Sequence, residues 1–185
     1  LTQDIDLSGH LWTAIGQDED GLKFTGAFDG GGRSIIGLHI DGASEYLGLF
    51  GVIGENGSVR NLTLSGAAVY SEDRYVGTVA GKIYSAVIEN VNLNNCSLTT
   101  TGYYAGGLAG SGEGAFLINS CKVTDSTITS SSRYLGGILG YANDYETGNS
   151  AVISSCIVSD SQIETSNRYA GGICAYIRGD YNNVY

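Results

Sequence analysis

The chain has 185 residues, of which 42% are hydrophobic, and a net charge of −10. This composition excludes a disordered chain, and the acidic balance argues against nucleic-acid binding, which requires a basic surface. No apolar run approaches the roughly 18 residues that a membrane-spanning helix needs, so we expect no membrane insertion.

The N-terminal segment, residues 1–41, differs from the rest of the chain. It contains a W-x-x-I-G segment, Trp12-Thr-Ala-Ile-Gly16, and an F-D-G segment, Phe24-Thr-Gly-Ala-Phe-Asp-Gly30. The apolar residues Ile5 and Leu7 are two positions apart, which is typical of a strand with one buried face. We expect residues 1–41 to form an N-terminal coil and residues 42–185 to form repeats of the same single domain, 1–185.

Two sequence markers recur along the chain with one period. The first is an aromatic residue followed two positions later by glycine, and its copies begin at Phe24, Tyr46, Tyr75, Tyr104, Tyr134 and Tyr169. The second is a pair of apolar residues two positions apart, found at Leu38/Ile40, Leu62/Leu64, Val91/Leu93, Cys121/Val123 and Cys156/Val158. Two independent markers that share a period of roughly 30 residues indicate a structural repeat.

The apolar alternation is a strand pattern, and no stretch has helical spacing over three turns. We therefore predict an all-β protein, a parallel β-solenoid (β-helix) of about six coils. Equivalent residues of successive coils would then stack in ladders about 4.8 Å apart. The absence of proline fits this prediction, because in-register ladders need a backbone N–H at almost every strand position.

The repeat also predicts the corner of each coil. Glycines two positions after the aromatic residues are expected to mark a tight corner in each coil, which would not tolerate a Cβ if φ is positive there: Gly26, Gly48, Gly77, Gly106, Gly136 and Gly171. The aromatic residues are expected to point inward as one ladder, and the residues just before them outward. Polar residues that precede the apolar pairs are expected to form hydrogen bonds between coils: Asn61, Asn90, Ser120 and Ser155.

The outward column contains the candidate ligand-binding residues Arg74, Tyr103, Arg133 and Arg168. Stacked like charges destabilise a sheet unless they are neutralised or face an anionic partner. We therefore predict a basic, aromatic stripe for a host glycan or protein ligand. The alternative is a ladder neutralised by neighbouring acids such as Asp73. Further aromatic residues are expected in loops, at Tyr141, Tyr145, Tyr176 and Tyr181.

An acidic pair is the alternative site. Asp125 and Asp160 occupy equivalent positions one coil apart, which would place them near 5 Å, as in the carboxylate pairs of glycan-cleaving enzymes. The same column holds Asn95 and Gly66, which indicates a solvated turn. Because the chain also has neither an H-E-x-x-H motif nor an evident Ser–His–Asp arrangement, we expect no enzymatic activity. A carbohydrate-active β-helix enzyme is the alternative.

We expect no metal site and no cofactor. The four cysteines, Cys96, Cys121, Cys156 and Cys174, lack the C-x-x-C spacing of zinc sites, so we expect buried free thiols. A Cys121–Cys156 disulfide is the alternative, since these residues lie one coil apart. Asp18-Glu-Asp-Gly21 offers oxygen donors but lacks the twelve-residue loop of calcium sites, and we expect an acidic hairpin tip.

Several segments resemble the bacterial GLUG-motif proteins. They are the W-x-x-I-G and F-D-G segments, Gly48-Leu-Phe-Gly51, Gly57-Ser-Val-Arg-Asn-Leu-Thr-Leu64, Gly107-Leu-Ala-Gly110 and Gly137-Ile-Leu-Gly140. The resemblance implies a right-handed parallel β-helix of a secreted or cell-surface bacterial protein. Such proteins include adhesin-like proteins and the repeat regions of IgA-specific metallopeptidases. From it we expect a non-catalytic adhesion, binding or spacer module, or alternatively an accessory region of a secreted metallopeptidase. Because the chain begins without Met, we also expect a processed protein or a piece of a larger polypeptide.

Overall fold

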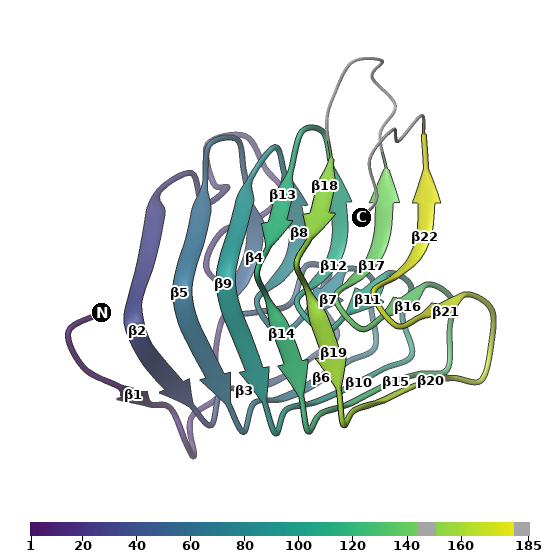
Figure 1. Cartoon of the computed structure of the whole chain (residues 1–185), viewed down its shortest axis with the longest axis horizontal. Coiled ribbons are helices and arrows are strands. Elements are labelled where there is room, and N and C mark those ends of the chain that lie inside the picture. Colours follow the sequence, from purple (N-terminus) through teal and green to yellow (C-terminus); the bar gives the residue numbers. More distant parts are fainter. Residues whose placement is uncertain (144–150, 180–185) are drawn as a thin grey trace.

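The computed structural model describes residues 1–143 and 151–179. Within these residues the chain forms 22 strands and no helix. All of the strand pairs are parallel, and the coils stack along one axis with the N-terminus at one end (Figure 1). The predicted all-β parallel solenoid is confirmed, whereas its handedness and the single-domain boundaries stay predictions. The described part contains no helix long and apolar enough to cross a membrane.

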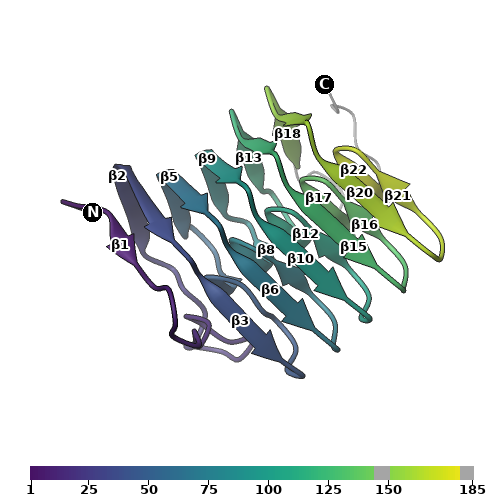
Figure 2. The ribbon, with the colours of Figure 1, turned by 90° about the horizontal axis from the view of Figure 1, so that it is seen from below.

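Four sheets make up the wall of the solenoid, and each coil contributes to each of them in turn. The eight-stranded front sheet contains β1 (Ile5–Asp6), β2 (Ala27–Ile36), β5 (Ser58–Ser65), β9 (Val87–Asn94), β13 (Leu117–Asn119), β14 (Lys122–Thr124), β18 (Val152–Ser154) and β19 (Ile157–Ser159). The lower sheet, which faces the viewer in Figure 2, contains β3 (His39–Gly42), β6 (Ala68–Ser71), β10 (Ser97–Thr100), β15 (Thr127–Ser130) and β20 (Gln162–Thr165).

The other two sheets follow the corner of each coil. The corner sheet contains β7 (Val76–Gly77), β11 (Ala105–Gly106), β16 (Leu135–Gly136) and β21 (Ala170–Gly171). The back sheet contains β4 (Phe50–Ile53), β8 (Ala80–Tyr84), β12 (Ala109–Glu113), β17 (Leu139–Asn143) and β22 (Cys174–Arg178). A corner therefore joins the lower sheet to the back sheet in every coil.

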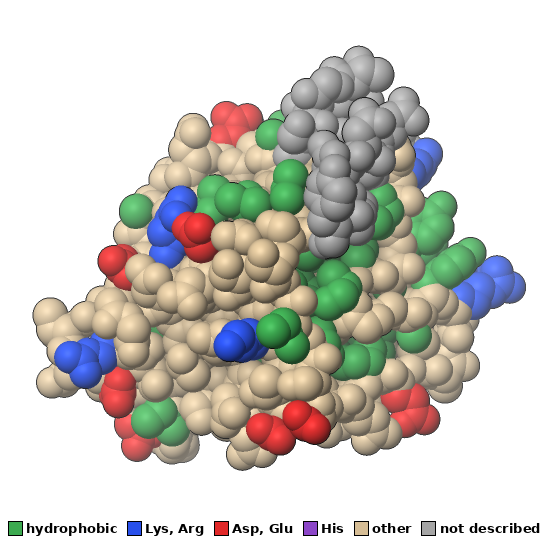
Figure 3. Space-filling model, viewed as in Figure 1, with side chains coloured by type: hydrophobic (Ala, Val, Ile, Leu, Met, Phe, Trp, Pro, Cys, Tyr) green, Lys and Arg blue, Asp and Glu red, His purple; other side chains and the backbone are tan. Residues whose placement is uncertain are grey.

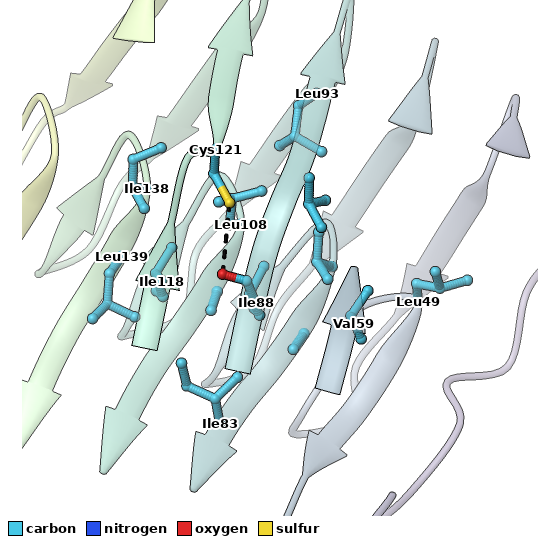
Figure 4. Packing of buried hydrophobic residues seen from close by; sticks show 14 of the residues in the cluster. Leu49, Val59, Ile83, Ile88, Leu93, Leu108, Ile118, Cys121, Ile138 and Leu139 are labelled. Carbon is cyan, nitrogen blue, oxygen red and sulfur yellow. Dashed lines mark hydrogen bonds between the residues drawn. The ribbon is translucent and has the colours of Figure 1, made fainter. Parts of the chain in front are cut away.

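The core lies between the sheets and is built from the predicted apolar pairs. Leu62, Leu64, Val91 and Leu93 are at most 1% exposed. Cys121 points into the same interior and its thiol donates to the Ile88 carbonyl at 3.8 Å (Figure 4). Successive coils bury one another's apolar side chains, since a single coil could not cover its own inner face.

Bends in each coil are made by residues with positive φ, and these are mostly not the glycines predicted. The corner tyrosines have φ of 61–64°, and Asn61, Asn90, Ser120 and Ser155 have φ of 52–55°. Asn90 Nδ2 donates to Asn61 Oδ1 at 2.9 Å, so the predicted hydrogen bond between coils is present at this pair. Asparagine tolerates this conformation because its short side chain bonds locally.

The corner glycines are needed for a different reason. Gly48, Gly77, Gly106, Gly136 and Gly171 do not have positive φ. A Cβ atom at each of them would instead collide with backbone atoms of its own or the neighbouring coil. These glycines therefore lie at the predicted corner, but the positive φ belongs to the tyrosine two residues earlier.

The number of coils is also smaller than predicted. The lower and back sheets each contain five strands in the described residues. The expected sixth coil is incomplete at the N-terminus. Leu11 bridges His39 and Ile15 bridges Phe50, but no full strand forms there. This segment pairs with the first full coil only through isolated bridges.

We predict that Gly136→Ala lowers the free energy of unfolding by about 2 kcal/mol, because overpacking at a close contact costs roughly 1–3 kcal/mol. The new methyl group would overlap the Leu139 carbonyl and lie 3.0 Å from the Ile173 carbonyl of the next coil. Gly172→Ala is the control, because a Cβ at Gly172 would have no atom within 4 Å. Urea denaturation of both variants measures the effect. Equal stability of the two variants would contradict the collision.

Candidate functional site: a tyrosine ladder beside an arginine column

Five tyrosines at successive corners form a continuous stack, called here the tyrosine ladder. Its members are Tyr46, Tyr75, Tyr104, Tyr134 and Tyr169. Consecutive ring centroids are 4.8, 5.0, 5.2 and 5.1 Å apart, and the rings are inclined by at most 19°. The coil spacing positions them, because Leu47 and Val76 N–H groups donate to the carbonyls of the next coil's ladder tyrosines. The ladder therefore runs parallel to the solenoid axis.

The ladder differs from the prediction in two respects. Phe24 is not part of it, since this ring packs on Phe50 at a centroid distance of 4.6 Å. The tyrosines are also not buried in the core. Four are half-buried, and Tyr169 is 44% exposed. Strand alternation does not apply to them because they lie in a turn. A positive φ is unfavourable for such a bulky residue, and the stacking of rings offsets this cost.

Two more tyrosines widen this aromatic surface. Tyr141 in β17 and Tyr176 in β22 are register partners whose rings stack at 5.6 Å. The Tyr141 ring lies 4.8 Å from Tyr104, and the Tyr176 ring lies 5.4 Å from Tyr169. The prediction that these two lie in loops was wrong, because both belong to strands of the back sheet. Tyr145 and Tyr181 lie outside the described residues. We call the ladder together with Tyr141 and Tyr176 the tyrosine face.

The residues just before the ladder tyrosines form a second, outward column, as predicted. We call Arg74, Tyr103, Arg133 and Arg168 the arginine column, and all four are exposed. The Tyr75 N–H donates to the Tyr103 carbonyl at 3.0 Å, and the Tyr104 N–H donates to the Arg133 carbonyl at 3.3 Å. These bonds hold the column in register beside the ladder.

The members of the column differ in how their charge is neutralised. Arg74 forms an ion pair with Glu45 and lies 3.9 Å from Asp73, so the alternative of a neutralised ladder holds at this position. The Arg133 guanidinium lies over the Tyr103 ring at 5.9 Å. Within residues 1–143 and 151–179, neither Arg133 nor Arg168 forms an ion pair. Figure 3 shows basic side chains beside hydrophobic ones at the end of the molecule where β21 and β22 lie.

A charged cluster occupies the N-terminal end of the tyrosine face. Lys82 Nζ lies 3.3 Å from Asp18 and 3.1 Å from Glu113. Burial opposes the charge of Lys82, but the two carboxylates outweigh it and raise the pKa of the ammonium group. The Tyr46 hydroxyl donates to Asp18. Asp18 is thus neutralised by Lys23 and Lys82 and hydrogen-bonded to Tyr46.

The acidic pair lies on another part of the molecule. Asp125 and Asp160 directly follow the paired residues Thr124 and Ser159 of β14 and β19, so they are neighbours between coils. Both are exposed, with φ of 51° and 50°. This geometry is that of the predicted solvated turn. A catalytic role for the pair stays a prediction.

All four cysteines are free thiols, with Cys96 and Cys121 buried and Cys156 and Cys174 half-buried. A hydrogen bond with Cys156 and burial raise the pKa of the Cys121 thiol. Burial raises the pKa of Cys174 to about 11. In the described part of the chain, no three His, Cys, Asp or Glu side chains come together in a group that could hold a metal ion.

Sequence reasoning missed Lys82 and Glu113, and it singled out Asp18 only as part of the acidic hairpin tip. The only signal for Lys82 is that a charged residue follows Gly81, where the equivalent positions hold Ser111 and Tyr141. The partner Asp18 comes from the irregular N-terminal segment, 64 positions away. No periodic pattern could have connected the two.

Comparison with known proteins finds partial likenesses. No family model matches the chain, so the resemblance to GLUG-motif proteins stays a prediction. A protein of Evansella cellulosilytica, provisionally named a Gly-rich membrane protein, is 42% identical over 102 residues, which are 50% of this chain and 12% of that protein. Halomucin of Haloquadratum walsbyi is 36% identical over 84 residues, which are 44% of this chain and 1% of halomucin.

The solved structure that matches belongs to a protein of Bacteroides ovatus provisionally named an immunoglobulin A1 protease. It shares 16% identity and a TM-score of 0.46, with 96% of this chain and 75% of that chain covered. A similarity of this size gives no information about activity. The chain spans only a small fraction of the length of the two sequence relatives.

We predict that the protein loses stability as the pH rises above about 10, the ordinary pKa of tyrosine. Burial, and for Tyr46 also the hydrogen bond to Asp18, raise the pKa values of Tyr46, Tyr75 and Tyr104. Above pH 10 the unfolded chain therefore releases protons that the folded chain retains, which favours unfolding. Urea denaturation between about pH 8 and pH 11 measures this slope.

Tyr46→Phe should make the free energy of unfolding decrease less steeply above pH 10, because it removes one of the hydroxyl groups that keep their proton in the folded chain. Tyr103→Phe, which removes an exposed hydroxyl outside the ladder, is the matched control and should follow the unsubstituted protein. A slope that is unchanged in Tyr46→Phe would show that this hydroxyl is not protected in the folded state.

Proposed function

We propose that this chain is a non-catalytic β-solenoid module of a secreted or cell-surface bacterial protein. In this proposal it extends the parent polypeptide as a spacer and binds an anionic glycan along the arginine column. The alternatives are a carbohydrate-active β-helix enzyme and an accessory region of a secreted metallopeptidase.

The observation that carries the binding role is the exposure of Arg133 and Arg168 without an ion pair among the described residues. They lie in adjacent coils of a chain whose net charge is −10. Acidic side chains that could neutralise them are abundant in such a chain, and Arg74 in the same column does have such a partner. Stacked cations cost stability unless an anion neutralises them. An external anionic ligand supplies that anion.

The neighbouring side chains favour a glycan. Guanidinium groups bind carboxylates and sulfates through paired N–H donors. Tyr103 is 43% exposed and Tyr169 is 44% exposed, and the faces of such rings can stack on sugar C–H groups. Because the column repeats in each coil, successive sugar units could contact successive coils. A protein ligand is the alternative, because arginine and tyrosine are also enriched at protein–protein interfaces.

The spacer role and the location rest on the architecture and on the sequence relatives. A relative provisionally named a Gly-rich membrane protein aligns over 12% of its length, and halomucin over 1%. Such coverage supports a unit within a much larger polypeptide. Each stacked coil adds length along one axis, and the loops between its strands can vary. Both properties suit a unit that projects from a cell surface.

We predict that the double variant Arg133→Gln/Arg168→Gln loses at least about tenfold in affinity for sulfated and uronate glycans, since a charged hydrogen bond contributes roughly 1.5–3 kcal/mol. Heparin and polygalacturonate are the probes, measured by calorimetry at low and high salt. The matched control is Arg33→Gln/Lys122→Gln, which removes the same charge from exposed positions in β2 and β14. Equal losses of affinity in both variants would show that only the net charge of the protein affects binding.

The non-catalytic part of the proposal has its own test. Polysaccharides of several classes are incubated with the protein and with Asp125→Asn/Asp160→Asn, and released oligosaccharides are quantified. We expect no product from either protein. Product formation that is lost in the double variant would identify the chain as an enzyme and assign the acidic pair to its active site.

A further inference from the structure

The N-terminal end of the tyrosine ladder carries a recess that the other coils do not form in the same way. Between the bridges Leu11–His39 and Ile15–Phe50, the N-terminal segment has three residues, 12–14, whereas the next coil has ten, 40–49. The shorter segment cannot cover the corner of the longer one. An uncovered space of about 290 Å³ remains between them.

Aromatic and polar side chains line this recess. The aromatic ones are Trp12 and Tyr46, and the polar ones are Thr13, Gln17, Asp41, Ser44 and Glu45. Lysine and arginine are absent from the residues that line it. The carboxylate of Glu45 is already paired with Arg74. The recess therefore offers two aromatic surfaces together with hydrogen-bonding groups and no positive charge for an anion.

Tyr46 is the first rung of the ladder and has a neighbouring ring on one side only. One face stacks on Tyr75 at 4.8 Å. No second ring in the described residues packs against Tyr46, which lines the recess. The hydroxyl of Tyr46 donates to Asp18, so the ring is held in place from both its face and its tip.

Trp12, which also lines the recess, is fixed by two hydrogen bonds. Its indole Nε1 donates to the Leu49 carbonyl at 3.0 Å, and its backbone N–H donates to the His39 carbonyl at 2.8 Å. Both aromatic groups are thus held in position without a ligand, which lowers the entropy cost of binding. A stack that ends on a fixed, uncovered ring can be continued by one flat group.

We propose that this recess binds one neutral pyranose ring, stacked on Tyr46 as an added rung of the ladder. The C–H face of a sugar is weakly positive and matches the negative face of an aromatic ring. Asp41 and Ser44 lie where they can bond to the sugar hydroxyls, with the carboxylate accepting and the hydroxyl donating or accepting. The site is separate from the arginine column in both residues and ligand charge, so it does not depend on the glycan-binding role proposed above.

Trp12 provides a direct readout, because it is the only tryptophan of the chain. Titration with the methyl glycosides of glucose, galactose, mannose and N-acetylglucosamine should change its fluorescence in a saturable way for at least one sugar. We expect affinity in the millimolar range that is typical of a single small ring. Choline and acetate serve as the cationic and anionic probes and should leave the emission unchanged.

Filling the recess is the decisive variant. Ser44→Tyr places a bulky ring at an exposed lining position and should weaken the best sugar at least tenfold. Ser131→Tyr makes the same change in a corner of an interior coil, where the residue is also exposed, and should bind like the unsubstituted protein. Circular dichroism confirms that both variants fold. Asp41→Asn, which changes the carboxylate but little of the shape, should weaken binding by a smaller factor.

Each other outcome overturns the proposal. These outcomes are no saturable response to any of the four sugars, a response to choline or acetate instead, or equal binding by Ser44→Tyr and Ser131→Tyr. The variant Arg133→Gln/Arg168→Gln should retain full sugar-induced fluorescence. Its behaviour separates a failure of this site from a failure of the arginine column.

Discussion

Each coil donates backbone hydrogen bonds to the next coil and accepts others from it, and every strand pair among the described residues is parallel. Equivalent side chains are therefore held one above another along the whole axis. The chain contains no proline, which would remove a ladder donor. Glycine is required at Gly136 and its equivalents because a Cβ there would collide with backbone atoms of its own coil or of the neighbouring coil. Core, corners and surface all follow from this one spacing.

The same spacing stabilises some columns and destabilises others. Tyrosine gains from it, because rings about 5 Å apart can stack, and this gain offsets the positive φ of the corner. Arginine loses, because like charges are brought together. The arginine column meets this cost unevenly. Arg74 is neutralised by Glu45, whereas Arg133 and Arg168 form no ion pair among the described residues. This uncompensated repulsion between Arg133 and Arg168 is the physical reason for proposing an anionic ligand at the arginine column.

A second kind of surface arises where the periodicity ends. Inside the solenoid every rung of the tyrosine ladder has neighbours, so its faces are occupied. At the N-terminal end the short segment around Trp12 replaces a full coil and leaves Tyr46 with one uncovered face. The lateral surface offers repeated charge to a long ligand, and the recess at the end offers an aromatic surface to a single ring. The two surfaces therefore suit ligands of different size and charge.

The spacing of residues was enough to predict the periodic part of this protein. The spacing of Leu62 and Leu64 and of their equivalents predicted the strands, the parallel stacking, the buried column and the outward position of Arg133, because one period applies to all coils. Tertiary structure decided what is not periodic. In the structure the positive φ of the corner belongs to Tyr46 and not to Gly48. The sequence could not show this, because a glycine can be required either by a positive φ or by a close backbone contact. The tertiary structure also joined Asp18 to Lys82 and shaped the recess at Trp12, because contacts between the irregular N-terminal segment and the first coil have no repeat from which to predict them.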